Sequence, residues 1–114
     1  MAEAWHFEPL VRDLVALLVQ GDYAAVERRS RGVRLNAAAL AGAVAGYGRR
    51  LVPLPPGPLP LDVVPIATAG APAWSVAVPL WTAEEGRSDL ALSLTLVAES
   101  PGAYRVEVDN LHVL

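Results

Sequence analysis

The chain has 114 residues, of which 54% are hydrophobic and 18% are charged, and its formal net charge is −3. A chain of this length buries roughly two-thirds of its unfolded surface on folding, enough for one hydrophobic core and too little for two. The hydrophobic fraction excludes an intrinsically disordered chain. An acidic balance without a block of basic residues argues against nucleic acid as a partner.

Cysteine and lysine are both absent, so all nine positive charges are arginine. This excludes disulfides, thiolate metal sites and thiol nucleophiles, and also Schiff-base and P-loop chemistry. The first residues lack the basic start of a signal peptide, and the apolar run at residues 14–19 is too short to cross a bilayer. We therefore expect a cytoplasmic protein with no membrane anchor and no cofactor.

A proline-rich segment, residues 53–60, divides the chain. Its prolines fix φ and remove backbone donors, so neither a helix nor a central strand can cross it. Apolar residues recur at helical spacing before it, in residues 8–50, and in a β pattern after it, in residues 61–114. Because each half is too small to stand alone, we predict one α+β domain over residues 1–114, with helices packed on a four-stranded antiparallel sheet.

Three helices are expected before the proline-rich segment. The first starts near Pro9, a favoured residue at the first helical position, and runs to Gln20. Asp22 is expected to cap a short second helix, and Asn36 a third. Gly48 is expected to end the third helix in the left-handed conformation.

Four strands are expected after the proline-rich segment, joined by short loops that make neighbours antiparallel. They cover residues 61–68, 74–82, 89–98 and 103–113. In the last strand, apolar residues occupy even positions up to Val108 and odd positions from Leu111 on. A β-bulge near residues 109–110 would reconcile the two halves and bend the strand.

The strand at residues 74–82 is apolar on both faces, which is unusual in an antiparallel sheet. Helices cover only one face, so the other must meet a ligand, a partner or another copy of the chain. We predict a homodimer packed sheet to sheet. Trp74 and Trp81 lie seven residues apart and fall on opposite faces, one in the core and the other at a dimer seam or a pocket.

The order of these elements resembles a known superfamily. A first helix ending at residues 21–23, a helix after residues 34–36, a proline-rich crossing and a bent antiparallel sheet are similar to the nuclear transport factor-like, cystatin-like α+β superfamily. The stretches 79–90 and 106–114 look like small bacterial proteins of unknown function. The resemblance implies a curved sheet and helices that form a cone, whose mouth holds a ligand in some members and is filled in others. It implies no activity, and no catalytic residue is carried over.

Several polar residues are candidates for acid–base chemistry. If His112 points into the cone beside Asp62 or Asp89, the pair would serve as general base and orienting carboxylate. Asp109 lies close by in the sequence, and Tyr47 completes the set. The alternative is that His112 is a half-buried histidine bonded to a backbone carbonyl.

The charged turn before the third strand offers a binding alternative. Arg87 and Asp89 would form a polar rim around Trp81, because buried aromatic residues with arginine are the usual hot spots of interfaces. Trp74 is the fourth candidate binding residue. The structural alternative is a solvated hairpin loop in which Gly86 takes a positive φ.

Two other patterns favour structural roles. The arginine run at residues 28–31, with Arg34, adjoins Glu27 and is flanked by no aromatic platform, which favours a solvated helix end over nucleic-acid binding. His6 and His112 have no third defined ligand in the sequence, so no metal site is expected.

Two functions from different classes follow. The first is a non-catalytic interaction module, a homodimer that holds a protein partner through its sheet face, its cone mouth or its hairpin loop. The second is a small-molecule enzyme of isomerase or hydrolase type that uses a His/Asp acid–base pair in the cone. An open cavity with convergent polar groups would favour a ligand site, whereas a cavity filled by Leu, Val and Trp would remove the enzyme hypothesis.

Overall fold

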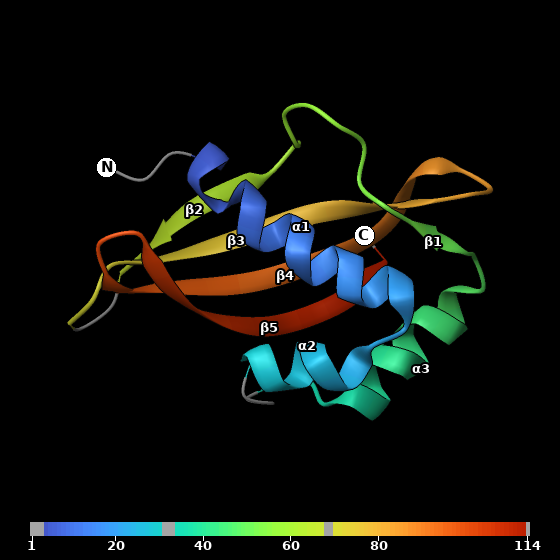
Figure 1. Ribbon diagram of the computed structural model, residues 1–114, viewed down its shortest axis with the longest axis horizontal. Coiled ribbons are helices and arrows are strands. Elements are labelled where there is room, and N and C mark those ends of the chain that lie inside the picture. Colours follow the sequence, from blue (N-terminus) through green and yellow to red (C-terminus); the bar gives the residue numbers. More distant parts are fainter. Residues whose placement is uncertain (1–3, 31–33, 68–69, 114) are drawn as a thin grey trace.

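The computed structural model describes residues 4–30, 34–67 and 70–113. In this part of the chain three helices precede an antiparallel sheet (Figure 1). The helices are α1 (Ala4–Gln20), α2 (Tyr23–Ser30) and α3 (Ala37–Tyr47). The strands are β1 (Leu51–Val52), β2 (Asp62–Ile66), β3 (Ala73–Thr82), β4 (Gly86–Ser100) and β5 (Ala103–Val113).

The sheet has five strands, not the four predicted from the sequence. Its order is β1-β3-β4-β5, and β2 pairs with β3 along the same edge as β1. The missed strand, β1, forms only the pairs Leu51↔Thr82 and Val52↔Trp81. Two residues directly before a proline are too few to show alternation, so the sequence carries no strand signal there.

The first helix begins at Ala4, earlier than the predicted start near Pro9. Pro9 lies inside the helix and leaves one intrahelical hydrogen bond unmade. The fully buried Phe7 gives this extra segment a reason to fold, because its ring lies 5.4 Å from that of Trp74 and 5.1 Å from that of Tyr104. Tertiary packing therefore outweighs the local preference of proline for a helix start.

The predicted caps of α2 and α3 are confirmed. Asp22 Oδ1 accepts a hydrogen bond from the backbone N–H of Ala25 at 3.2 Å, and Asn36 Oδ1 accepts one from Ala39 at 2.8 Å. Gly48 ends α3 with φ 74°. These short polar side chains satisfy N–H groups that have no partner inside the helix.

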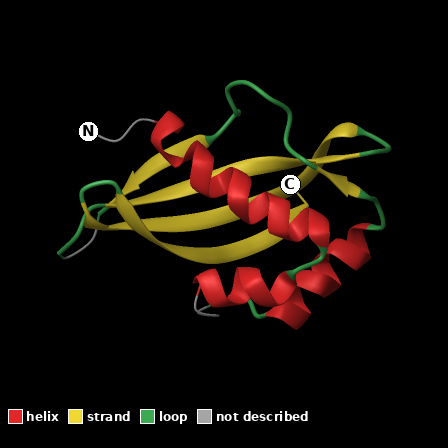
Figure 2. Ribbon diagram, viewed as in Figure 1, coloured by secondary structure: helices red, strands yellow, loops and turns green. Residues whose placement is uncertain are grey.

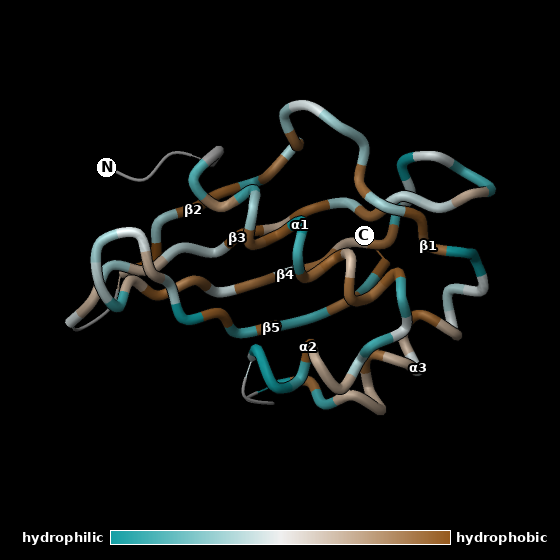
Figure 3. Tube along the Cα trace, in the orientation of Figure 1, coloured by the Kyte–Doolittle hydropathy of each residue, from teal (hydrophilic) through white to brown (hydrophobic). Residues whose placement is uncertain are grey.

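The three described helices lie on one side of the sheet, and none of them lies on the other side (Figure 2). Helix α1 runs across the strands, while α2 and α3 pack beside β5. Leucine and valine side chains fill the space between α1 and the sheet. Hydrophobic stretches, brown in Figure 3, recur along the central strands. The fully buried members of this core include Val11, Leu14, Leu18, Leu40, Leu80, Leu90, Leu92, Leu94 and Leu96.

The predicted bulge in the last strand is confirmed. Ser93 pairs with Asn110 and Leu94 with Val108, so Asp109 is an extra residue in β5. The extra residue reverses which residues, odd- or even-numbered, face the core. The even-numbered Val108 before the bulge and the odd-numbered Leu111 after it are therefore both buried. Residues with the parity of His112 consequently face away from the helices after the bulge.

The proline-rich segment is fastened to α1. The Arg12 guanidinium donates from Nη1 to the carbonyl of Pro55 at 2.9 Å and from Nη2 to that of Gly57 at 2.6 Å. Glu8 Oε1 accepts a hydrogen bond from the backbone N–H of Leu59 at 2.8 Å. The segment thus returns along the covering helix and carries the chain from β1 to β2.

Candidate functional site

The sheet face that points away from the helices, called the open face below, has a floor of small side chains. Alternation in β3 and β4 puts the large core residues on the covered face and the residues between them on the open face. These open-face residues are Ala73, Ser75, Ala77 and Pro79 in β3, and Ala91, Ser93, Thr95 and Val97 in β4. A floor of this kind lets another surface approach the backbone closely.

Strand β2 borders this floor with larger apolar side chains. Register places Asp62, Val64 and Ile66 on the open face, opposite Ala77, Ser75 and Ala73. The side chains of Val64 and Ile66 are 51% and 37% exposed. Two large apolar side chains thus lie partly exposed on a sheet face that no described helix covers.

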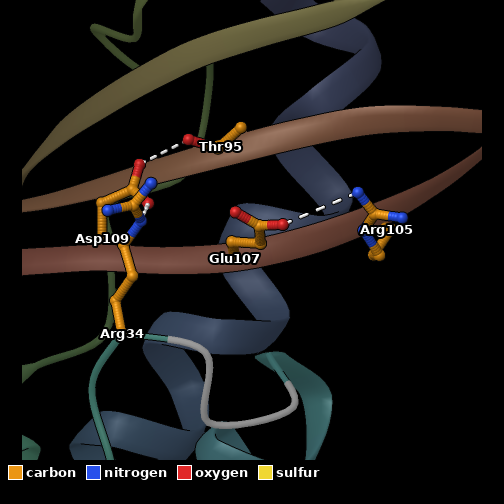
Figure 4. Close-up of polar contacts among 5 residues, drawn as sticks. All are labelled: Arg34, Thr95, Arg105, Glu107 and Asp109. Carbon is orange, nitrogen blue, oxygen red and sulfur yellow. Dashed lines mark hydrogen bonds and ion pairs between the residues drawn. The ribbon is translucent and has the colours of Figure 1, made fainter. Parts of the chain in front are cut away.

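Strand β5 borders the other side of the floor with paired charges (Figure 4). Arg34 Nε lies 2.9 Å from Asp109 Oδ1, and Thr95 Oγ1 donates to Asp109 Oδ2 at 2.5 Å. Arg105 Nη2 lies 3.6 Å from Glu107 Oε2. Asp109 therefore holds the bulge to β4 and ties the segment before α3 to β5, which is a structural use of this carboxylate.

His112 occupies the open face, opposite Ala91, and does not point into the space between helices and sheet. Its Nδ1 atom is buried without a hydrogen-bond partner in the described part of the chain. Asp62 lies on the same face but on β2, across β3 and β4, and Asp89 is an exposed residue of β4. The structure thus does not assemble a hydrogen-bonded pair from His112 Nδ1 and either carboxylate.

Tyr47 belongs to a cluster around the β3–β4 hairpin. Its hydroxyl lies 2.9 Å from both carboxylate oxygens of Glu85, to which it donates. Thr82 Oγ1 also donates to Glu85 at 2.9 Å, and Glu84 accepts a hydrogen bond from the backbone N–H of Arg50 at 3.0 Å. Partial burial and the hydrogen bond to the Glu85 carboxylate raise the pKa of Tyr47 above its ordinary value of 10.0. Both acidic side chains of the hairpin, Glu84 and Glu85, thus accept hydrogen bonds from within the protein.

The four predicted binding residues are divided between the two faces. Trp81 is half-buried, has open-face parity and pairs directly with the exposed Arg87. Asp89 is exposed in the irregular part of the ladder, beyond the predicted turn, where Gly86 takes φ 73°. Trp74 packs against α1 on the covered face, so the two tryptophans do lie on opposite faces.

A groove of about 880 Å³ opens at the opposite end of the sheet from this hairpin. It is lined by Trp74 and Tyr104, by Pro72 and Pro101, and by Glu99 and His6. Sequence reasoning identified only Trp74 among these residues. The others come from the start of α1, the turn before β3 and the β4–β5 hairpin. These segments are far apart in the sequence, and no sequence pattern predicts that they meet.

Two classes of site find no support in the described residues. No group of three or more His, Asp and Glu side chains in residues 4–30, 34–67 and 70–113 could hold a metal ion. None of the helices described here has the length and apolar character needed to cross a membrane.

Comparisons with known proteins give a family but no activity. No curated protein matches the chain. No solved structure matches it either, so the resemblance to the nuclear transport factor-like superfamily has no support from a known fold. Residues 15–114 match the sequence model of a family described as a domain of unknown function (DUF7668), and the chain therefore belongs to that family.

Proposed function

We propose that the chain is a non-catalytic interaction module that holds a protein partner on its open face, and that this partner is a second copy of the chain. The observation that carries the proposal is the exposure of Val64 and Ile66 on a sheet face that none of the described helices covers. Full burial of an exposed valine or isoleucine side chain contributes roughly 1.5–3 kcal/mol, and covering these half-exposed side chains contributes roughly half of that each. A second copy on this face would remove the remaining exposed surface of both side chains from water.

Shape favours a second copy. A two-fold dimer needs one patch that is complementary to itself. The open face combines a ridge, Val64 and Ile66 on β2, with a neighbouring floor of small side chains on β3 and β4. With the two-fold axis parallel to the strands, the ridge of each copy lies against the floor of the other, and sheets can pack face to face in this way.

The edges of the sheet suit a partner less well than the open face does. Pro65 in β2 has no N–H to offer to an added strand. On β5, the bulge at Asp109 and the charged residues Arg105 and Glu107 interrupt the regular edge. Bulges and charges on edge strands are the usual protection against strand addition. Association through the face is therefore the arrangement that we expect.

The enzyme alternative lacks an assembled acid–base pair. The space between α1 and the sheet is filled with aliphatic side chains, and the His112 Nδ1 atom has no partner in the described part of the chain. Tyr47 donates to Glu85 at the hairpin, and Asp109 is bound by Arg34 and Thr95. The candidate groups thus point to different places, whereas acid–base catalysis needs them around one pocket.

Sedimentation equilibrium of the full chain between 1 and 100 µM tests the proposal. We expect a dimer, and we expect Val64→Asp to raise the dissociation constant at least about tenfold, because it buries a charge in the seam. Val113→Asp is the matched control, since Val113 is 56% exposed and pairs with Leu90 on the covered face. A wild-type chain that stays monomeric at 100 µM, or a dimer that Val64→Asp leaves intact, would overturn the proposal.

A native mass spectrum of the protein purified from its own cells then identifies the partner. A homodimer supports the assignment. A stoichiometric complex with a different polypeptide, lost in Val64→Asp, would keep the open face as the binding surface but replace the second copy as its occupant.

A further inference from the structure

The groove at the end of the sheet has an aromatic wall. Trp74 and Tyr104 both line it, with ring centroids 5.9 Å apart and ring planes at 80°. Phe7 supports both rings from the core side, at 5.4 Å from Trp74 and 5.1 Å from Tyr104. The two lining rings are thus held nearly perpendicular by packing, before any ligand is present.

A carboxylate accompanies these rings. Glu99 lines the groove and is the extra residue of an irregular step in the β4–β5 ladder, where Ala98 pairs with Tyr104 and Ser100 with Ala103. Irregular steps of this kind redirect a side chain from the regular alternation. The Glu99 side chain has no hydrogen bond or ion pair among the described residues, unlike Glu85, Glu107 and Asp109. No arginine among the described residues lines the groove.

We propose that this groove binds a small organic cation that carries an apolar body. An aromatic ring attracts a cation to its face through the ring quadrupole, and a neighbouring carboxylate adds a direct charge. Prolines 72 and 101 complete an apolar lining for the rest of the ligand. The volume of about 880 Å³ lies in the range of small-molecule sites, and such sites are mostly apolar with a few polar groups.

The site is independent of the proposed dimer. Trp74 packs against α1 on the covered face, whereas Val64 and Ile66 belong to the open face. A failure of the dimer proposal would therefore leave this inference untouched, and the reverse also holds.

A matched pair of probes tests the charge requirement. We would titrate the full chain with 3-phenylpropylamine, which is cationic at pH 7, and with the neutral 3-phenylpropan-1-ol. Shifts of the Trp74 indole N–H signal and of the Gly102 amide report binding, the indole signal being assigned with Trp74→Phe. We expect the amine to bind roughly three- to tenfold more tightly than the alcohol.

Glu99→Gln removes the carboxylate from the groove with little change in shape. It should bring the amine to the affinity of the alcohol, whereas Asp13→Asn, an exposed carboxylate on α1 outside the groove, should leave both affinities unchanged. Equal binding of the two probes by wild type, no shift with the amine at 20 mM, or an unchanged amine affinity in Glu99→Gln would each overturn the proposal. A capped Gly-Arg-Gly peptide that binds at least tenfold more tightly than the amine would also overturn it, because the occupant would then be a protein segment.

Discussion

The two faces of the sheet are built from alternate residues of the same strands, yet they differ in almost every physical respect. On the covered face of β4, four leucines at alternate positions from Leu90 to Leu96 are buried in the core that the helices share with the sheet. On its open face, the residues between them are alanine, serine, threonine and valine. The covered face therefore contributes most of the buried apolar surface that stabilises the fold. On the open face, the large apolar residues Val64 and Ile66 of β2 remain exposed.

This division explains why the fold does not dictate what the open face contacts. Packing of Leu92 or Leu94 requires a side chain of similar volume, because cavities in a closed core are costly. Small open-face residues such as Ser93 have no comparable packing demand. Stability and contact can thus be altered separately, and the following experiments measure how complete the separation is.

The largest effect is expected from a cavity on the covered face. Leu94 lies at the centre of the sheet and is fully buried, so Leu94→Ala should lower the free energy of unfolding by about 2–5 kcal/mol. Ser93→Ala, one residue along the same strand on the open face, should change it by less than about 0.5 kcal/mol. Urea denaturation followed by tryptophan fluorescence measures both.

A comparable loss in both variants would contradict the division of the two faces. It would indicate that the open face is packed as tightly as the core, for example inside a dimer that is obligatory for folding. Repeating the measurement at two protein concentrations tests this explanation, since unfolding that is coupled to dissociation of a dimer depends on protein concentration and unfolding of a monomer does not.

Local signals explain the parts of the fold that the sequence predicts well. The caps at Asp22 and Asn36, the αL residue Gly48 and the four longer strands follow from residue types at fixed offsets and from alternation. The bulge at Asp109 was visible as a change of phase in the apolar positions. The same change of phase determines the face of His112, but only once the register with β4 is known.

Non-local packing explains what the sequence could not give. The early start of α1 depends on Phe7 meeting Trp74 and Tyr104, which lie far away along the chain. The groove with Glu99 depends on three segments meeting at one end of the sheet. The pairing of Tyr47 with Glu85 likewise joins a helix to a distant hairpin. None of these contacts leaves a spacing that can be recognised in one sequence.

The stability of the helical layer should depend on the hydrogen bonds between Arg12 of α1 and the proline-rich segment. Arg12→Met keeps the apolar stem but removes the hydrogen bonds to the Pro55 and Gly57 carbonyls, and we expect a loss of about 1–3 kcal/mol. Arg49→Met, at an exposed arginine after α3, is the matched control and should be nearly neutral. Thermal unfolding by circular dichroism distinguishes the two. Equal melting temperatures of Arg12→Met and Arg49→Met would show that the proline-rich segment keeps its conformation without the hydrogen bonds from α1.

A smaller effect is expected where the covering layer is capped. Asn36→Ala removes the hydrogen bond to the Ala39 N–H and should cost about 1 kcal/mol, while Asn36→Asp should retain most of the stability. Chemical denaturation measures the difference, and hydrogen exchange of the α3 amides shows whether the loss is local. An alanine variant as stable as wild type would mean that the hydrogen bond from Ala37 N–H to Glu27 at 2.6 Å already holds this helix end.

The smallest effect is expected at the β3–β4 hairpin, where Tyr47 of α3 donates a hydrogen bond to Glu85. Because the pKa of Tyr47 is raised in the folded protein, its hydroxyl stabilises the fold below pH 10.0, and that contribution is lost as pH rises through the folded-state pKa. Ionisation would place a phenolate against the Glu85 carboxylate, which accepts the hydroxyl proton at 2.9 Å. Tyr47→Phe should therefore lack the latest component of the tyrosine titration at 295 nm and should lose less stability than wild type above pH 10. Tyr23→Phe should retain both features. A late component that survives in Tyr47→Phe would assign the raised pKa to another tyrosine and would mean that the contact between α3 and the hairpin does not hold the Tyr47 proton.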